Sequence, residues 1–86
     1  MKKNKNKKIS RTQAIEVIKN TNGKIFTVTF TKNNGTERTI NGNVKGNSIT
    51  PLGYINIYSM SDKGYRNVNS RTIKSVSFNK VNYIVK

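Results

Sequence analysis

The chain has 86 residues, 33% of them hydrophobic, and it contains neither cysteine nor histidine. A chain this short forms one small domain, and without cysteine it has neither a disulfide framework nor a thiolate metal site. No apolar run approaches the roughly 20 residues that cross a bilayer, and no apolar signal core follows the Lys-rich start, so we expect no membrane partner and a cytoplasmic location.

Charge is the strongest global feature. Seventeen Lys and Arg oppose three acids, giving a net charge of +14, and five of the lysines lie in the first eight residues, so 14 − 5 leaves +9 on the remainder. A basic domain attracts polyanions, and nucleic acid, RNA or DNA, is the usual polyanion of a cytosol. Two alternatives stay open: a merely solvated basic surface, and a Lys- and Asn-rich composition set by an AT-rich genome.

The first elements are an arm and a helix. Residues 1–8 (MKKNKNKK) form a charge run that we expect to be a disordered Lys-rich arm, and residues 9–86 form the single domain. Ser10 followed by Gln13 is a capping box, which predicts a helix over residues 10–20. The cluster that ends in Gly23 stops this helix, whose apolar stripe must pack on another element because about three turns are unstable alone.

The middle of the chain predicts a β-hairpin and a loop. Residues 24–32 (KIFTVTFTK) alternate apolar side chains with threonine, the pattern of a half-buried strand. The Asn34-Gly35 pair then predicts a hairpin turn, and residues 36–44 return as a second strand in which Gly42 marks a bulge. Residues 45–53 hold the only proline and two glycines and predict a loop.

The last third predicts three further strands and a fourth that closes the sheet. Residues 54–60 place isoleucines on one face and tyrosines on the other, and a turn at residues 62–64 leads into a strand over 65–69. Residues 70–72 resemble one tight helical turn. A strand with a small irregularity then covers 73–78, followed by a two-residue turn and a strand over 81–85.

Together these elements predict a mostly β fold. Short strands separated by frequent turn signals favour a small SH3-like or Sm-like antiparallel barrel of five or six strands, preceded by one short N-terminal α-helix. Closure suits a short chain because it removes exposed strand edges. An open sheet with the helix packed across it is the alternative.

The stretches GKIFTVTFTKNNGTERTINGNV and YINIYSMSDKGYRNVNSRTIKSV resemble a family of small bacteriophage proteins with an Sm-like SH3 β-barrel, related to the barrel of WYL domains. The resemblance covers nearly all of the chain after the arm, but Ser59 stands where the family often has an acid, and the middle loop is short. It implies the barrel fold, a location in the host cytoplasm, and oligomers formed through barrel edge strands. Matching positions are Gly23, Lys24, Ile25, Phe26, Val28, Phe30, Lys32, Gly35, Thr36, Arg38, Tyr58, Gly64, Tyr65, Arg66 and Ile73.

The sequence predicts no enzyme, because no residues form a recognisable catalytic set. The three acids, Glu16, Glu37 and Asp62, fall on a helix, a hairpin and a turn, so no acid–base pair or carboxylate metal cage is expected. No phosphate-binding glycine loop appears. We therefore expect no catalytic residue, no metal and no cofactor.

The positive signal is basic residues interleaved with aromatic ones. Tyrosine rings stack on unpaired bases while cations hold phosphates, so the candidate partner is RNA or single-stranded DNA. Structural roles compete: Tyr58 and Tyr83 suit core packing, Arg66 suits an ion pair with Asp62, and Arg38 suits a hairpin contact. The candidate nucleic-acid-binding residues are Lys24, Lys32, Arg38, Lys45, Tyr54, Tyr65, Arg66, Arg71 and Lys74.

Two other functions remain open. The chain is also compatible with a phage-encoded module that binds and modulates a host protein, and with a virion-associated structural protein. Sequence alone does not separate them.

Overall fold

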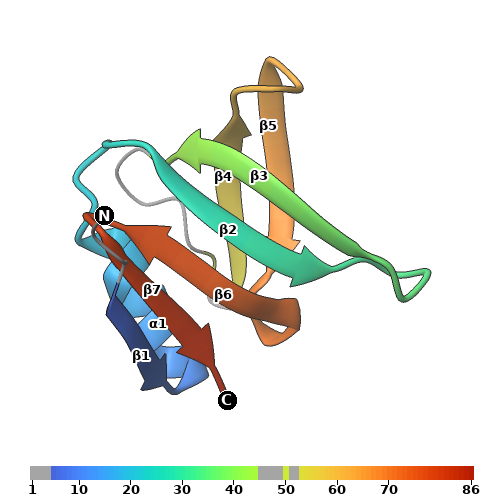
Figure 1. The fold of residues 1–86 in the computed structure, drawn as a ribbon. Coiled ribbons are helices and arrows are strands. Elements are labelled where there is room, and N and C mark those ends of the chain that lie inside the picture. Colours follow the sequence, from blue (N-terminus) through green and yellow to red (C-terminus); the bar gives the residue numbers. More distant parts are fainter. Residues whose placement is uncertain (1–4, 45–49, 51–52) are drawn as a thin grey trace.

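The computed structural model describes residues 5–44, 50 and 53–86. One sheet dominates the fold, with a single α-helix and one 3₁₀ turn (Figure 1). The elements are β1 (Lys5–Ile9), α1 (Arg11–Lys19), β2 (Phe26–Thr31), β3 (Glu37–Asn43), β4 (Tyr54–Ser59), β5 (Gly64–Asn69), η1 (Ser70–Thr72), β6 (Ile73–Phe78) and β7 (Val81–Val85). The predicted mostly β fold with one N-terminal helix is confirmed.

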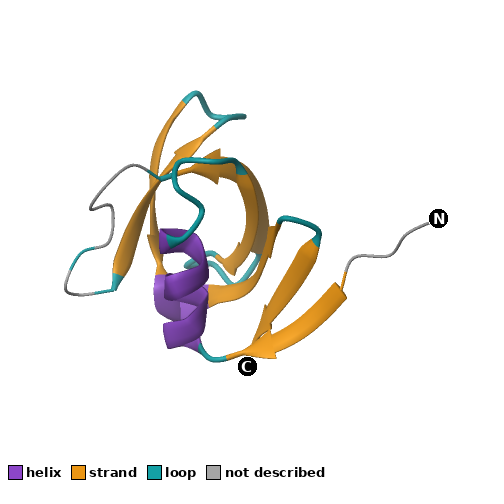
Figure 2. Ribbon diagram, turned by 90° about the vertical axis from the view of Figure 1, so that its left-hand side faces the viewer, coloured by secondary structure: helices purple, strands orange, loops and turns teal. Residues whose placement is uncertain are grey.

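The sheet has seven strands in the order β1-β7-β6-β2-β3-β4-β5, rather than five or six, and it is open between its two end strands. Only two residue pairs join β3 to β4, Gly42 with Ser59 and Asn43 with Tyr58. The β4–β5 hairpin therefore leaves the plane of the other strands and crosses behind β2 and β3 (Figure 1). Figure 2 shows α1 standing against the curved inner side of the sheet.

The helix forms where the capping box predicts it. The Gln13 amide donates to Ser10 Oγ at 3.2 Å, and the Ser10 amide donates to Gln13 Oε1 at 2.9 Å, so both orphan donors are satisfied. Ala14 and Ile18 are buried on the face that contacts β6 and β7. This docking supplies the stability that a nine-residue helix lacks by itself.

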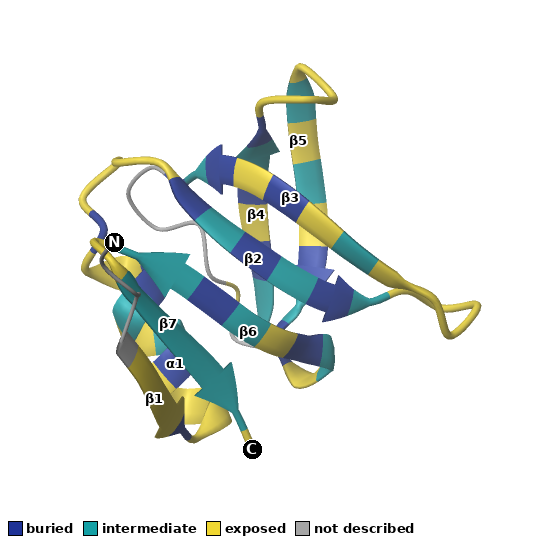
Figure 3. Cartoon of the chain, in the orientation of Figure 1, coloured by how far each residue is buried: buried dark blue, intermediate teal, exposed yellow. Residues whose placement is uncertain are grey.

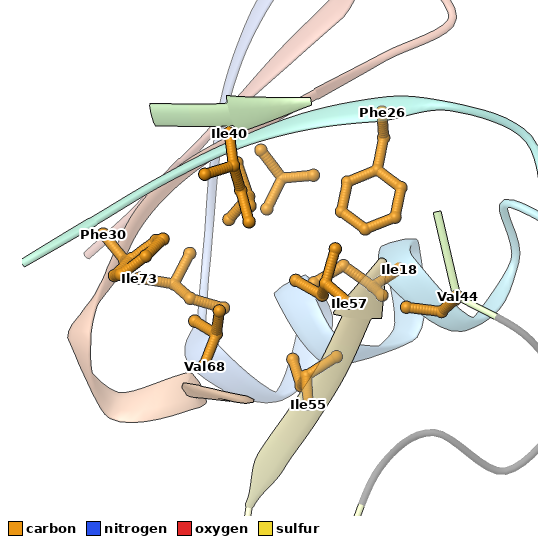
Figure 4. Packing of buried hydrophobic residues seen from close by; sticks show 11 residues of the cluster. Ile18, Phe26, Phe30, Ile40, Val44, Ile55, Ile57, Val68 and Ile73 are labelled. Carbon is orange, nitrogen blue, oxygen red and sulfur yellow. The ribbon is translucent and has the colours of Figure 1, made fainter. Parts of the chain in front are cut away.

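The core lies between the two parts of the bent sheet. In β2, Phe26, Val28 and Phe30 are buried while the intervening threonines are half-exposed, as the alternation predicts (Figure 3). The core cluster takes side chains from α1 and from five strands (Figure 4): Ile18, Phe26, Val28, Phe30, Ile40, Val44, Ile55, Ile57, Val68, Ile73 and Val76.

The predicted Lys-rich arm differs from the structure. Residues 5–8 lie in β1, which pairs in parallel with β7 from Lys5 opposite Val81 to Ile9 opposite Val85. Ile9 is buried and anchors the strand, and backbone pairing with β7 compensates for the scarcity of apolar side chains. Residues 1–4 lie outside the described part of the chain.

Candidate nucleic-acid interface

A cleft of about 460 Å³ opens between β5, the end strand of the open sheet, and the tip of the β2–β3 hairpin. Amides, hydroxyls and two cationic side chains predominate in its lining. The lining residues are Phe30, Thr31, Lys32, Asn33, Asn34, Tyr54, Arg66, Asn67, Val68, Asn69 and Thr72. A cleft of this chemistry suits an anionic or strongly hydrogen-bonding ligand rather than an apolar one.

Strand periodicity brings Arg66 to this cleft. Arg66 lies two residues before the buried Val68 and opposite Ile57, so its side chain leaves the strand on the core-facing side. Because β5 is the end strand, that side opens into the cleft near its rim. The guanidinium is therefore half-buried, with 40% of the side chain exposed.

Arg66 is also part of a charged cluster with Asp62 and Arg38. Arg38 Nη2 donates to both oxygens of Asp62, at 2.8 and 2.7 Å, and Arg66 Nε lies 3.8 Å from Asp62 Oδ2. The hydrogen bonds from Arg38, helped by the Ser59 hydroxyl and the charge of Arg66, hold the pKa of Asp62 below its ordinary 3.8. The cluster keeps one net positive charge beside the cleft.

A row of tyrosine and asparagine side chains covers the outer face of the β4–β5 hairpin. In register, Tyr54 faces Asn69, Asn56 faces Asn67 and Tyr58 faces Tyr65. The rings of Tyr58 and Tyr65 meet edge to face, with centroids 5.2 Å apart and planes at 77°. We call these six residues the Tyr–Asn face.

Within the Tyr–Asn face the side chains differ in how free they are. Tyr65 is 56% exposed, whereas Tyr54 and Tyr58 are half-buried. The Asn69 side chain is engaged, because its Oδ1 accepts the Arg71 amide and caps η1. Tyr65 is therefore the ring most available to a ligand, and Tyr58 supports it.

The structure gathers some of the sequence-predicted residues and separates others. Lys32, Tyr54 and Arg66 line the cleft together, and Tyr65 lies on the adjoining outer face of β5. Arg38 reaches the cleft only indirectly, through Asp62. It pairs with this acid rather than serving as an ornament of its own hairpin.

The remaining predicted residues lie elsewhere or outside the description. Arg71 is exposed on η1, one residue before Thr72 of the cleft lining, and Lys74 on β6 lies 4.0 Å from Glu37. Lys24 precedes β2 while Lys32 follows it, so the two lie roughly 25 Å apart along an extended strand. Lys45 is outside the described residues.

Sequence reasoning missed the amide side chains of the cleft. Asn33 and Asn34 were interpreted only as turn residues, and Asn67 only as part of a strand, yet all three line it. Asn34 also holds its own turn, because its Oδ1 accepts the amide and the hydroxyl of Thr36. Period-2 spacing from Tyr65 gives the signal for Asn67, since both must share one face of β5.

Among the described residues, no group of three or more acid side chains lies close enough to hold a metal ion. In the same part of the chain, no helix has the length and apolar character needed to cross a membrane. No protein-family model, no curated protein and no solved structure matches this chain.

Proposed function

We propose that this protein is a non-enzymatic module that binds single-stranded nucleic acid through the cleft and the Tyr–Asn face. The observation that carries the proposal is the position of Lys32, Arg66 and Tyr54 around one cleft, next to the exposed ring of Tyr65. Cations beside flat rings suit a strand whose phosphates and unstacked bases are both accessible.

The two parts of the interface have separate roles in this proposal. Lys32 and Arg66 hold phosphates at the cleft, and asparagine amides of its wall take hydrogen bonds from sugars or base edges. Tyr65 stacks on a base. Tyr54 and Tyr58 are four residues apart on β4, roughly 13 Å, which leaves room for more than one nucleotide along the hairpin.

We also propose that strands β6-β2-β3-β4-β5 correspond to the Sm-like SH3 barrel of the phage protein family. The order of these strands, the sharp bend between β3 and β4, and the 3₁₀ turn η1 before β6 support this assignment. On this view β1 and β7 extend the barrel unit at one side, and the protein acts in the host cytoplasm.

The test is fluorescence anisotropy of the full chain with labelled single-stranded RNA, single-stranded DNA and duplex DNA across a salt series. The full chain is needed because removing residues 1–8 would remove most of β1. We expect single strands to bind more tightly than duplex. The slope of log affinity against log salt falls by about 0.7 when one phosphate contact is lost, so Lys32→Gln should lower it by that amount.

Lys24→Gln is the matched control. It removes the same charge from an exposed lysine at the other end of β2, and should leave the slope nearly unchanged. Tyr65→Ala should weaken single-strand binding by about 5- to 150-fold, the range for one lost base stack, while Tyr65→Phe should retain it. Equal effects of Lys32→Gln and Lys24→Gln, with no effect of Tyr65→Ala, would contradict the proposal and direct attention to a host-protein or virion role.

A further inference from the structure

The outermost strand, β1, has backbone groups that face away from the sheet. Within the described residues β1 pairs on one side only, with β7. The Ile9 carbonyl accepts the Lys86 amide at 3.0 Å, so Ile9 directs its backbone groups towards the β7 side. In a parallel ladder successive residues direct their amide and carbonyl to opposite sides, so those of Asn6 and Lys8 point to the open edge.

The side chains at this edge carry positive charge on both faces of the sheet. Lys8 lies opposite Ile84 on one face, Lys7 opposite Tyr83 on the other, and both lysines are exposed. Arg11 begins the helix that follows, and Lys86 is bonded to Ile9. Acidic residues are absent from β1 itself, so a strand laid along the edge meets cations above and below.

We propose that the open edge of β1 binds an extended acidic peptide of a partner protein, which adds to the sheet as an eighth strand. The backbone groups of Asn6 and Lys8 supply the ladder that another peptide backbone satisfies, and the lysines select a partner whose alternate residues are Asp or Glu. This surface is separate from the nucleic-acid interface, since β1 and β5 are opposite ends of the sheet order.

Two other occupants fit less well. A second copy of this chain would place lysines against lysines, and each copy carries +14. A nucleic acid strand would use the charges but has no backbone that pairs with a β-strand edge. The peptide uses both features.

The experiment measures binding of a labelled ten-residue peptide, in which Asp alternates with Val, to the full-length protein at about 0.1 M salt. Lys8→Gln removes one charge and keeps the edge amide, so we expect a two- to fivefold loss of affinity. Lys8→Pro removes the same charge and also the outward-facing amide, so we expect a further loss of about tenfold. A peptide with Pro at alternate positions is the ligand-side control and should not bind.

Amide exchange gives a second measurement that requires no substitution. Bound peptide should slow exchange at Asn6 and Lys8 in the unaltered protein, and the core amides should not change. The proposal is overturned if the proline peptide binds as well as the parent, or if Lys8→Pro matches Lys8→Gln while exchange at Asn6 and Lys8 is unaffected. It is also overturned if single-stranded nucleic acid, rather than peptide, protects those two amides, or if sedimentation shows that β1 mediates dimers.

Discussion

Gly42 is the residue on which the bend of the sheet depends. It lies where β3 crosses β4, opposite Ser59, and a Cβ built there would clash with the Tyr58 carbonyl oxygen and lie 2.8 Å from Ile57 Cγ2. The first neighbour is backbone and the second is a core side chain, so neither moves cheaply. Any larger residue at this position forces β3 and β4 apart.

We expect Gly42→Ala to lower the free energy of unfolding by about 3 kcal/mol, the upper range for overpacking in a core. For a domain of this size that is a fall of more than about 10 °C in the melting temperature, measured by circular dichroism. Gly64→Ala is the control, because Gly64 pairs with the same Ser59 from the other side and its Cβ would meet only Asp62 O at 3.9 Å. Similar losses in the two variants would show that the close approach at Gly42 is unimportant.

Asp62 makes stability depend on pH. Its pKa in the folded protein lies below 3.8, first because Arg38 donates to its carboxylate. A carboxyl with a lowered folded pKa contributes stability above its unfolded pKa, and this contribution is lost as pH falls through the folded value. We expect the melting temperature to decline from about pH 5 downwards, and Asp62→Asn to flatten that decline.

The control for this prediction is Glu37→Gln, which removes an acid whose partner Lys74 is 4.0 Å away with both side chains about 60% exposed. Its pH profile should follow that of the unaltered protein. At pH 7, Asp62→Asn should also bind single strands more tightly, because Arg66 loses its anionic neighbour. A profile for Asp62→Asn as steep as that of the parent would mean that another acid governs the acid transition.

At the scale of elements, local signals in the sequence predicted most of the structure. The capping box, the Asn-Gly turn and the alternation of β2 each act within a few residues, and each is confirmed. The two-residue turn at Asn79 and Lys80 also forms, with φ of 53° and 65°. The expected irregularity of β6 is a register shift opposite Thr29 and Phe30.

Elements held by distant backbone partners were not predictable in the same way. β1 has one buried apolar side chain, Ile9, and its pairing with β7 joins the two ends of the chain. The candidate site has the same dependence. The pair between Arg38 and Asp62 spans 24 residues and exists only because the β4–β5 hairpin folds across β3, a crossing that composition and periodicity do not specify.

At the scale of the whole molecule, net charge opposes folding. The +14 of the chain repels itself in the compact state, and the repulsion is strongest where cations adjoin, as at β1 with Lys7, Lys8, Arg11 and Lys86 nearby. Salt screens exposed charges within about 10 Å at 0.1 M. We therefore expect the melting temperature to rise by several degrees between about 0.01 and 0.3 M NaCl, while affinity for nucleic acid falls over the same range.

Hydrogen exchange distinguishes general screening from a local effect. Because β1 carries exposed lysines and one buried anchor, its amides should gain more protection from salt than those of β2, whose alternate side chains fill the core. Lys7→Gln should reproduce part of that gain at low salt, whereas Lys63→Gln in the β4–β5 turn, far along the sheet order from β1, should not. A melting temperature that stays constant or falls with salt would show that the excess charge is already dispersed enough to cost the fold nothing, and the basic surface would then place no strain on β1.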